Sequence, residues 1–152
     1  GKDVLLVGVL TGAFVFLSDL MRHISIPVSV DFVAVSSYNH GTDSSGVVRI
    51  LRDLDTNVEG RHVILVEDII DTGLTLQSLR ELLRTRNPAS FAICTAFDKP
   101  ERRRAPIHVE YVGMVIPDRF IVGYGLDFAG RYRNLPDVRI LKNENEGGIP
   151  CL

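Results

Sequence analysis

Short runs of apolar residues alternate along the chain with segments in which apolar residues recur every three or four positions. Residues 4–10 form a continuously apolar run, and residues 14–23 carry apolar side chains at helical spacing. A short run that is apolar throughout is typical of a parallel strand covered on both faces. With Thr11 and Gly12 between the two segments, the pattern predicts a first unit of strand, turn and helix.

The same alternation continues through the rest of the chain. Residues 28–35 predict a second strand and residues 63–66 a third, and leucines at helical spacing predict a helix over 76–84. This helix should end before Pro88, because the residue before a proline is pushed out of the α region. Later extended segments are expected at 91–97, 107–115 and 120–123. Strands that alternate with helices predict an α/β fold with a mostly parallel central sheet flanked by helices.

Two segments do not fit this alternation. Residues 36–46 are polar and rich in turn-forming residues, which predicts a mobile loop, and residues 47–54 predict a β-ribbon arm. The C-terminal residues 142–152 are rich in Gly, Asn and Glu and are expected to form a flexible tail. A chain of 152 residues fits one domain. We divide this domain into a core over about 3–105, a small hood with the C-terminal segment over about 106–141, and the tail.

Composition and charge narrow the classes of function. Apolar residues make up 45% and charged residues 24%, which is ordinary for a soluble globular protein. No apolar run approaches the roughly 18 residues that span a bilayer, and the apolar start lacks the basic leader of a signal peptide. Two cysteines are too few for a disulfide framework, so a reduced, cytoplasmic setting is expected. A net charge of −2 provides no basic field for nucleic acid or membranes, and Arg102–Arg104 reads as a solvated loop.

The stretch with the densest chemistry is 63–75, which reads VILVEDIIDTGLT. An apolar strand leads to Glu67 and Asp68 and then to a turn that opens a helix. In open α/β sheets, strand ends and helix N-termini meet at the edge where ligands bind. A glycine in such a turn lets the backbone approach a phosphate, helical amides point at it, and threonine hydroxyls add donors. The alternatives are a plain helix cap by Asp71 or Thr72, and solvated acids at a strand terminus.

This stretch resembles the phosphoribosyl pyrophosphate motif of the type I phosphoribosyltransferases, and its DIIDTG form resembles that of the hypoxanthine-guanine phosphoribosyltransferases. The resemblance covers residues 3–141 and keeps the family's order of motifs. The further matches are Leu10–Gly12 to the pyrophosphate loop, Ser36–Tyr38 to the flexible closing loop, Phe97–Lys99 to the purine-contacting lysine, Ile116–Asp127 to the base-binding hood, and Tyr132–Leu135 to the arginine segment.

The resemblance implies a purine-salvage enzyme. With Mg²⁺ as cofactor, it would transfer the phosphoribosyl group of phosphoribosyl pyrophosphate to a 6-oxopurine, hypoxanthine or guanine, to give IMP or GMP and pyrophosphate. Asp71 would be the general base. The implied binding residues are Glu67 and Asp68 for the ribose, Ile70, Thr72, Gly73, Leu74 and Thr75 for the 5′-phosphate, Leu10, Thr11, Gly12 and Arg133 for pyrophosphate, Lys99, Phe120, Ile121 and Asp127 for the purine, Ser37 and Tyr38 in the closing loop, and Asp127 and Glu67 for the metal.

Each of the later residues also has a plainer interpretation. Lys99 could be a solvated loop lysine, Phe120 a hood-core aromatic, Asp127 a turn acid and Arg133 a surface arginine. The alternative for the whole chain is a regulatory nucleotide-binding protein that keeps the fold and binds nucleic acid. The slightly acidic balance and the retained Asp71, Lys99 and Asp127 favour the enzyme, with no nucleic-acid or membrane partner. The resemblance implies a homodimer or homotetramer as the assembly.

The chain also departs from the family's usual pattern. Thr11 stands where many members have lysine, and the helical segment that usually precedes the first strand does not appear in this sequence. Family members often have a non-proline cis peptide in the pyrophosphate loop, so we predict one between Leu10 and Thr11. The preference among hypoxanthine, guanine and xanthine does not follow from the sequence.

Overall fold

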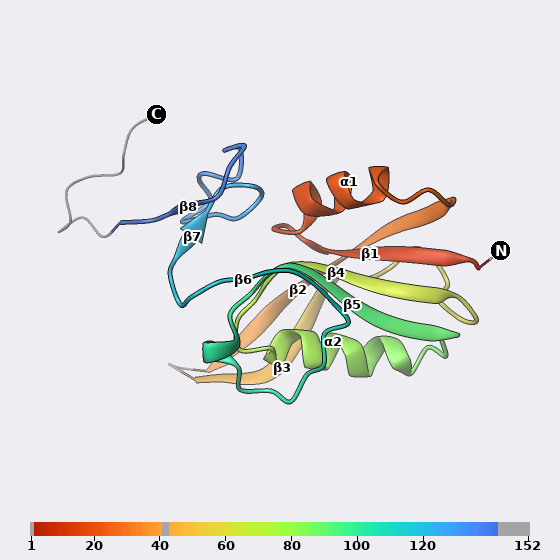
Figure 1. Cartoon of the computed structure of the whole chain (residues 1–152). Coiled ribbons are helices and arrows are strands. Elements are labelled where there is room, and N and C mark those ends of the chain that lie inside the picture. The colour runs from red at the N-terminus through yellow and green to blue at the C-terminus, as the bar shows by residue number, and fades with distance from the viewer. Residues whose placement is uncertain (1, 41–42, 143–152) are drawn as a thin grey trace.

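The computed structural model describes residues 2–40 and 43–142. Helices α1 and α2 lie on opposite faces of a central sheet (Figure 1). Along the chain the elements are β1 (Val4–Leu10), α1 (Phe14–Arg22), β2 (Val28–His40), β3 (Asp43–Arg52), β4 (His62–Ile70), α2 (Leu74–Arg84), β5 (Ser90–Asp98), the 3₁₀ turn η1 (Pro100–Arg102), β6 (Tyr111–Val115), β7 (Ile121–Val122) and β8 (Arg139–Ile140).

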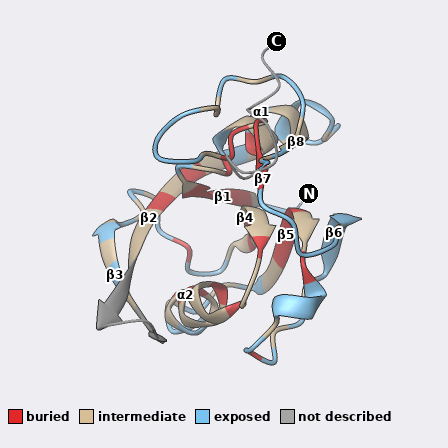
Figure 2. Cartoon of the chain, turned by 90° about the vertical axis from the view of Figure 1, so that its left-hand side faces the viewer, coloured by how far each residue is buried: buried red, intermediate tan, exposed pale blue. Residues whose placement is uncertain are grey.

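The sheet has the strand order β3-β2-β1-β4-β5-β6. Strand β1 pairs in parallel with β2 and β4, β5 pairs in parallel with β4 and β6, and β3 pairs antiparallel with β2. The predicted α/β fold with a mostly parallel sheet is therefore confirmed. Because β1, β4 and β5 run in the same direction, their carboxyl ends meet at one edge, which faces the viewer in Figure 2.

Alternate residues of the inner strands pack against the two helices. On the α2 side, Leu5 and Leu65 of the sheet share a buried cluster with Leu79 of the helix. On the α1 side, Leu6 and Leu17 share a second buried cluster. Burial on both faces explains why the sequences of these strands are continuously apolar. Packing against the two helices also holds the strand ends in place at the edge of the core.

Several predicted boundaries are wrong. The predicted loop over 36–46 is largely strand, because β2 continues to His40 and β3 begins at Asp43. Their antiparallel pairing, which includes Ser36 opposite Arg49, supplies the backbone partners that a polar segment would otherwise take from water. The strand predicted over 107–115 is confined to β6. The predicted tail lies almost wholly outside the described residues.

The hood lies above the α1 side of the carboxyl edge and contains β7 and β8, which form their own two-stranded sheet (Figure 1). Strand β6 belongs to the main sheet, so the chain leaves that sheet only after Val115, later than the boundary predicted near 105. Tyr124 Oη donates to Asp19 Oδ2 of α1 at 2.6 Å. Burial and this hydrogen bond raise the pKa of Tyr124 to about 12. The contact fixes the hood against the first helix.

Among the residues that the structure describes, no helix is long and apolar enough to cross a membrane.

The buried carboxylate of Asp31 should make stability depend on pH. Burial alone would raise its pKa, but hydrogen bonds from the backbone amides of Phe32 and Thr56, at 2.7 and 2.8 Å, lower it overall. Its contribution is present above the unfolded-state pKa and is lost as pH falls through the lower folded-state value. We expect Asp31→Asn to reduce the free energy of unfolding by about 2 kcal/mol at pH 7 and by much less at acidic pH, measured by urea denaturation.

The matched control is Asp55→Asn, since Asp55 is an exposed carboxylate that pairs with Arg52, as Asp31 does. This control should change stability little at either pH. An equal loss at both pH values for Asp31→Asn would contradict the assignment of a charge-dependent role to Asp31.

Candidate functional site

A pocket of about 180 Å³ lies where β4 passes into α2. Every residue predicted to bind the ribose or the 5′-phosphate lines it except Leu74, and so does the predicted base Asp71. The lining residues are Glu67, Asp68, Ile69, Ile70, Asp71, Thr72, Gly73, Thr75 and Leu76. Ile70 is buried in the core, and its carbonyl oxygen accepts from Lys99 N at 2.9 Å, so it supports the pocket wall rather than offering a group to a ligand. The structure therefore places the acids and hydroxyls of this motif around one cavity.

The turn between β4 and α2 is open to an anion. Gly73 is the N-cap residue of α2, has φ of +80°, and provides no side-chain cap. The first helical hydrogen bond runs from Gln77 N to Gly73 O at 2.9 Å, so the amides of the first turn have no helical acceptor. Thr72 Oγ1 lies 3.4 Å from Leu74 N, a weak contact. Capping by Asp71 or Thr72 does not account for this turn, whereas a bound phosphate would accept from its amides.

Glu67 and Asp68 lie inside β4 rather than beyond its end, because the strand continues to Ile70. Both are partly buried. Burial, the charge of Asp68 and a hydrogen bond with Asp68 raise the pKa of Glu67 well above its usual value. A carboxylate in this position favours a partner that supplies hydroxyl donors or positive charge. The plainer interpretation as fully solvated strand-end acids is wrong.

Glu67 and Asp68 have the carboxylate oxygens that could contribute to a Mg²⁺ site. The described residues contain no group of three or more His, Cys, Asp or Glu side chains that could hold a metal ion by themselves. Magnesium commonly takes one or two protein carboxylates and completes its shell with water and substrate phosphates. The unfavourable pairing of Glu67 with Asp68 matches that mode of binding. Asp127, the other predicted ligand, keeps free lone pairs but already has two partners, described below.

The loop after β1 carries the predicted pyrophosphate residues. The peptide bond between Leu10 and Thr11 is cis, as predicted, and Thr11 is exposed. Gly12 faces the pocket acids, because a side chain on its Cα would overlap the Asp68 carboxylate. The predicted pyrophosphate loop is thus in close contact with Asp68, one of the two acids predicted to bind the ribose.

The hood reaches the same loop from the other side. A side chain on Gly125 would overlap Gly12 O, so the two backbones are in close contact. Arg133 Nη1 donates to Gly125 O at 2.7 Å, and Arg133 Nη2 lies 3.1 Å from Asp127 Oδ1. Asp127 also accepts from Gly130 N at 2.8 Å, the turn contact that its plainer interpretation predicts. The two predicted ligand-binding residues Asp127 and Arg133 are therefore paired with each other beside the pyrophosphate loop.

Lys99 follows β5 and is buried, with 7% of its surface exposed, so the solvated-lysine interpretation is wrong. Its backbone amide donates to Ile70 O at 2.9 Å, which places it next to the end of β4. Phe120 is half exposed and packs edge to face on Phe128, with ring centroids 5.6 Å apart, so it is no hood-core aromatic. Ile121 is buried in β7. About half of the surface of the aromatic residue predicted to stack on the base is therefore exposed.

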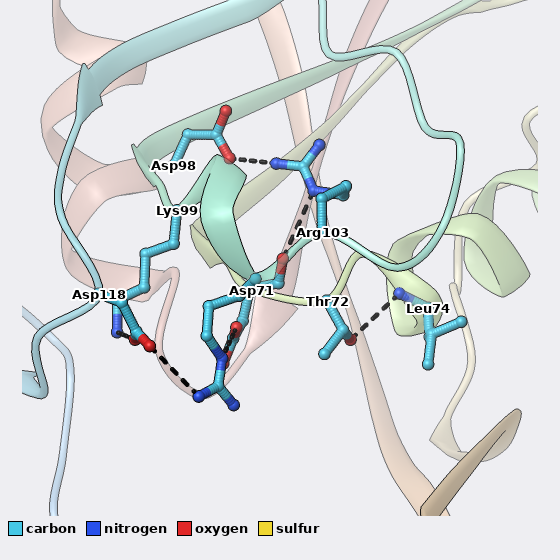
Figure 3. Close-up of polar contacts among 8 residues, drawn as sticks. Asp71, Thr72, Leu74, Asp98, Lys99, Arg103 and Asp118 are labelled. Atoms are coloured by element: carbon cyan, nitrogen blue, oxygen red, sulfur yellow. Dashed lines mark hydrogen bonds and ion pairs between the residues drawn. The ribbon is translucent and has the colours of Figure 1, made fainter.

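The arginines after Lys99 make contacts that were not predicted from the sequence. Arg102 Nε donates to Asp71 Oδ1 at 2.9 Å, and Arg103 is only partly exposed because it bonds to Asp98 and to Asp71 O (Figure 3). The interpretation of 102–104 as a solvated loop is wrong for Arg103. Three consecutive arginines in the sequence could have indicated a group of ion pairs. Their partners could not be predicted, because they depend on how η1 packs against the β4–α2 turn.

Ser37 and Tyr38 lie in β2, and their side chains are outside the described residues. Their assignment to a closing loop stays a prediction.

Comparisons with known proteins agree with this geometry. A family model for the phosphoribosyl transferase domain matches residues 1–129. A hypoxanthine-guanine phosphoribosyltransferase of Streptococcus agalactiae is 55% identical over 144 residues, which cover 95% of this chain and 80% of that protein.

Two solved structures have the same fold. A Staphylococcus aureus hypoxanthine phosphoribosyltransferase superposes with a TM-score of 0.93 at 48% identity, covering 97% of this chain and 80% of that one. A Trypanosoma cruzi hypoxanthine phosphoribosyltransferase in complex with the product IMP has a TM-score of 0.88 at 44% identity, covering 94% and 77%. The fold is thus the type I phosphoribosyltransferase fold, and the chain belongs to the phosphoribosyltransferase family.

Proposed function

We propose that this protein is a purine-salvage enzyme, a hypoxanthine-guanine phosphoribosyltransferase. It transfers the 5-phosphoribosyl group of phosphoribosyl pyrophosphate to a 6-oxopurine and releases pyrophosphate with IMP or GMP. The observation that carries the proposal is the pocket at the β4–α2 turn, where acids for a ribose, open amides for a phosphate and Asp71 share one cavity. The Trypanosoma cruzi relative binds the product IMP.

In this proposal the phosphoribosyl group lies along the β4–α2 turn. The 5′-phosphate accepts from the amides and hydroxyls of 72–75, and the ribose hydroxyls donate to Glu67 and Asp68. These contacts fix carbon 1 of the ribose relative to the incoming base. As the bond to pyrophosphate breaks, carbon 1 becomes cation-like, so positioning and stabilisation of the leaving group dominate catalysis.

Pyrophosphate leaves between the β1 loop and the hood. The Leu10–Gly12 backbone donates to it, and Arg133 supplies a planar guanidinium whose two N–H groups match phosphate oxygens. Arg133 now pairs with Asp127 at 3.1 Å, so it would have to bind pyrophosphate in addition to this partner or in place of it. Asp127 and Glu67 would hold Mg²⁺, and the bound ion would supply positive charge for the leaving pyrophosphate.

The purine lies between Lys99 and Phe120, which is half exposed. Lys99 donates to the oxygen at position 6, and Asp71 faces N7, from which it removes a proton in the forward direction. Phe120 stacks on the ring, and the backbone of Ile121 reads its edge. Because Lys99 carries three donors and no acceptor, it disfavours the amino group that adenine has at position 6.

A spectrophotometric assay tests the proposed reaction. The protein is supplied with phosphoribosyl pyrophosphate, Mg²⁺ and, in separate reactions, hypoxanthine, guanine, xanthine or adenine. We expect turnover with hypoxanthine or guanine, loss of turnover on chelation of the metal, and little turnover with adenine. If a folded protein shows no turnover with any base, the proposal is wrong. If the protein prefers adenine, it belongs to another branch of the family.

Lys99→Ala should abolish most of the discrimination between 6-oxopurines and adenine. Loss of one charged donor to the base should lower kcat/KM for hypoxanthine by about 10-fold to 100-fold and leave the value for adenine nearly unchanged. The KM for phosphoribosyl pyrophosphate should stay close to that of the wild type. If the ratio of kcat/KM for the two bases does not change, Lys99 does not contact position 6.

We further propose that the protein works in the cytoplasm as a homodimer or homotetramer. Its composition and the family resemblance support this, and light scattering of the purified protein would measure the assembly.

A further inference from the structure

Four charged side chains form a row of alternating sign from Lys99 to Asp71. Lys99 Nζ lies 3.8 Å from Asp118 Oδ1, Asp118 Oδ2 accepts from Arg102 Nη1 at 3.5 Å, and Arg102 Nε donates to Asp71 Oδ1 at 2.9 Å. Figure 3 shows Lys99 and Asp118 side by side, with Asp71 at the other end of the row. The row joins the side chain proposed to read position 6 of the base to the one proposed to accept its N7 proton.

Backbone hydrogen bonds fix the segments that carry this row. Lys99 N donates to Ile70 O at 2.9 Å, and Arg102 N donates to Lys99 O at 3.1 Å within η1. Ile116 N donates to Asp98 O at 2.9 Å and so anchors the segment that leads to Asp118. The ends of β4, β5 and β6 are thereby held together at the point where the four side chains meet.

We propose that Arg102 and Asp118 are positioning residues that set the spacing between Lys99 and Asp71 for a 6-oxopurine. Oxygen 6 and N7 are neighbours on the same edge of that base, so the two side chains that recognise them must be held at a fixed separation. This inference rests on the proposed phosphoribosyltransferase reaction.

The chemistry of Arg102 suits the task. Two different nitrogens of its planar guanidinium contact the two carboxylates, which fixes their relative orientation as well as balancing their charge. Lysine has a single ammonium on a flexible stem and cannot reproduce this bridge. A nearby second cation, Arg103, is bonded to Asp98 and to Asp71 O, so it has other partners.

Three of the four side chains in the row are well exposed, so we expect the row to position side chains more than to stabilise the fold. The side chains of Arg102, Asp71 and Asp118 are 47%, 46% and 41% exposed, whereas the side chain of Lys99 is 9% exposed. Ion pairs between exposed groups contribute little to folding. Variants at Arg102 and Asp118 should therefore fold normally, and changes in their kinetics can be assigned to the site.

The experiment compares Arg102→Gln, Arg102→Lys, Asp118→Asn and the double variant Arg102→Gln/Asp118→Asn in steady-state assays. We expect each single variant to lower kcat/KM for hypoxanthine by about fivefold, as for one exposed ion pair, with KM for phosphoribosyl pyrophosphate unchanged. Arg102→Lys should be as impaired as Arg102→Gln. The double variant should be no worse than the more impaired single variant, because both break the same row.

The matched control is the exposed ion pair between Asp53 and Arg86, with 2.8 Å between its charged atoms. Arg86 lies beyond the far end of α2 from the pocket, so Asp53→Asn should leave the kinetics unchanged. Full activity of Arg102→Lys, or additive losses in the double variant, would overturn the positioning role. Wild-type protein with no turnover would overturn the proposed function instead, so the two failures are distinguishable.

Discussion

Asp71→Asn should lower kcat for hypoxanthine by about 10²-fold to 10⁴-fold and change the KM for phosphoribosyl pyrophosphate much less. Asparagine keeps the size of the side chain, and its amide oxygen can still accept from Arg102 Nε, the present partner of Asp71 at 2.9 Å. What it loses is the ability to accept the proton from N7. The measurement is steady-state kinetics with each substrate varied in turn.

Two further results define the role of Asp71. The variant should bind phosphoribosyl pyrophosphate with near wild-type affinity by isothermal titration calorimetry, because the amides and hydroxyls of 72–75 remain. Equal losses in binding and in turnover would make Asp71 a binding residue, and the assignment as general base would then be wrong. Asp53→Asn, at the other end of α2, again controls for loss of one surface carboxylate.

Gly12→Ala is expected to lower kcat/KM for phosphoribosyl pyrophosphate by about 10²-fold or more. The added methyl group would overlap the Asp68 carboxylate, so Asp68 or the pyrophosphate loop must move. Misplacement of binding groups by about 1 Å is enough for such a loss. Because Gly125 lies close to Gly12 O on the hood side, the loop has little space in which to move away from Asp68.

Gly60→Ala is the control for the extra methyl group. Gly60 has φ of +72° and would meet no atom within 4 Å, so its substitution should cost about 1 kcal/mol of stability and leave kcat/KM unchanged. Wild-type kinetics in Gly12→Ala would show that the contact between the loop and Asp68 has no part in substrate binding. Circular dichroism on both variants separates this outcome from unfolding.

Much of the sheet could be predicted from local patterns. The bounds of β1 match the apolar run over 4–10, and α2 begins two residues before the predicted helix and ends with it. These predictions succeed because burial on both faces and helical periodicity both produce recognisable patterns among residues that are close in sequence. The motif over 63–75 likewise places its acids and hydroxyls around one pocket.

Features that depend on distant partners were missed. The polar segment after Val35 became strand because β3 supplies its hydrogen bonds, which its own composition does not reveal. The pairing of Arg102 with Asp71 depends on η1 returning over a turn 31 residues earlier in the chain. The contact of Gly125 with Gly12 depends on where the hood docks. Local sequence patterns report none of these tertiary contacts.

A crystal structure of the protein with IMP would test whether the nucleotide binds at the β4–α2 turn. We expect the 5′-phosphate within hydrogen-bonding distance, about 2.7–3.2 Å, of the amide nitrogens at the start of α2. We also expect the ribose hydroxyls to donate to Glu67 and Asp68, N7 to face Asp71, and oxygen 6 to face Lys99. A nucleotide bound away from the β4–α2 turn, or a base turned so that N7 points away from Asp71, would contradict it.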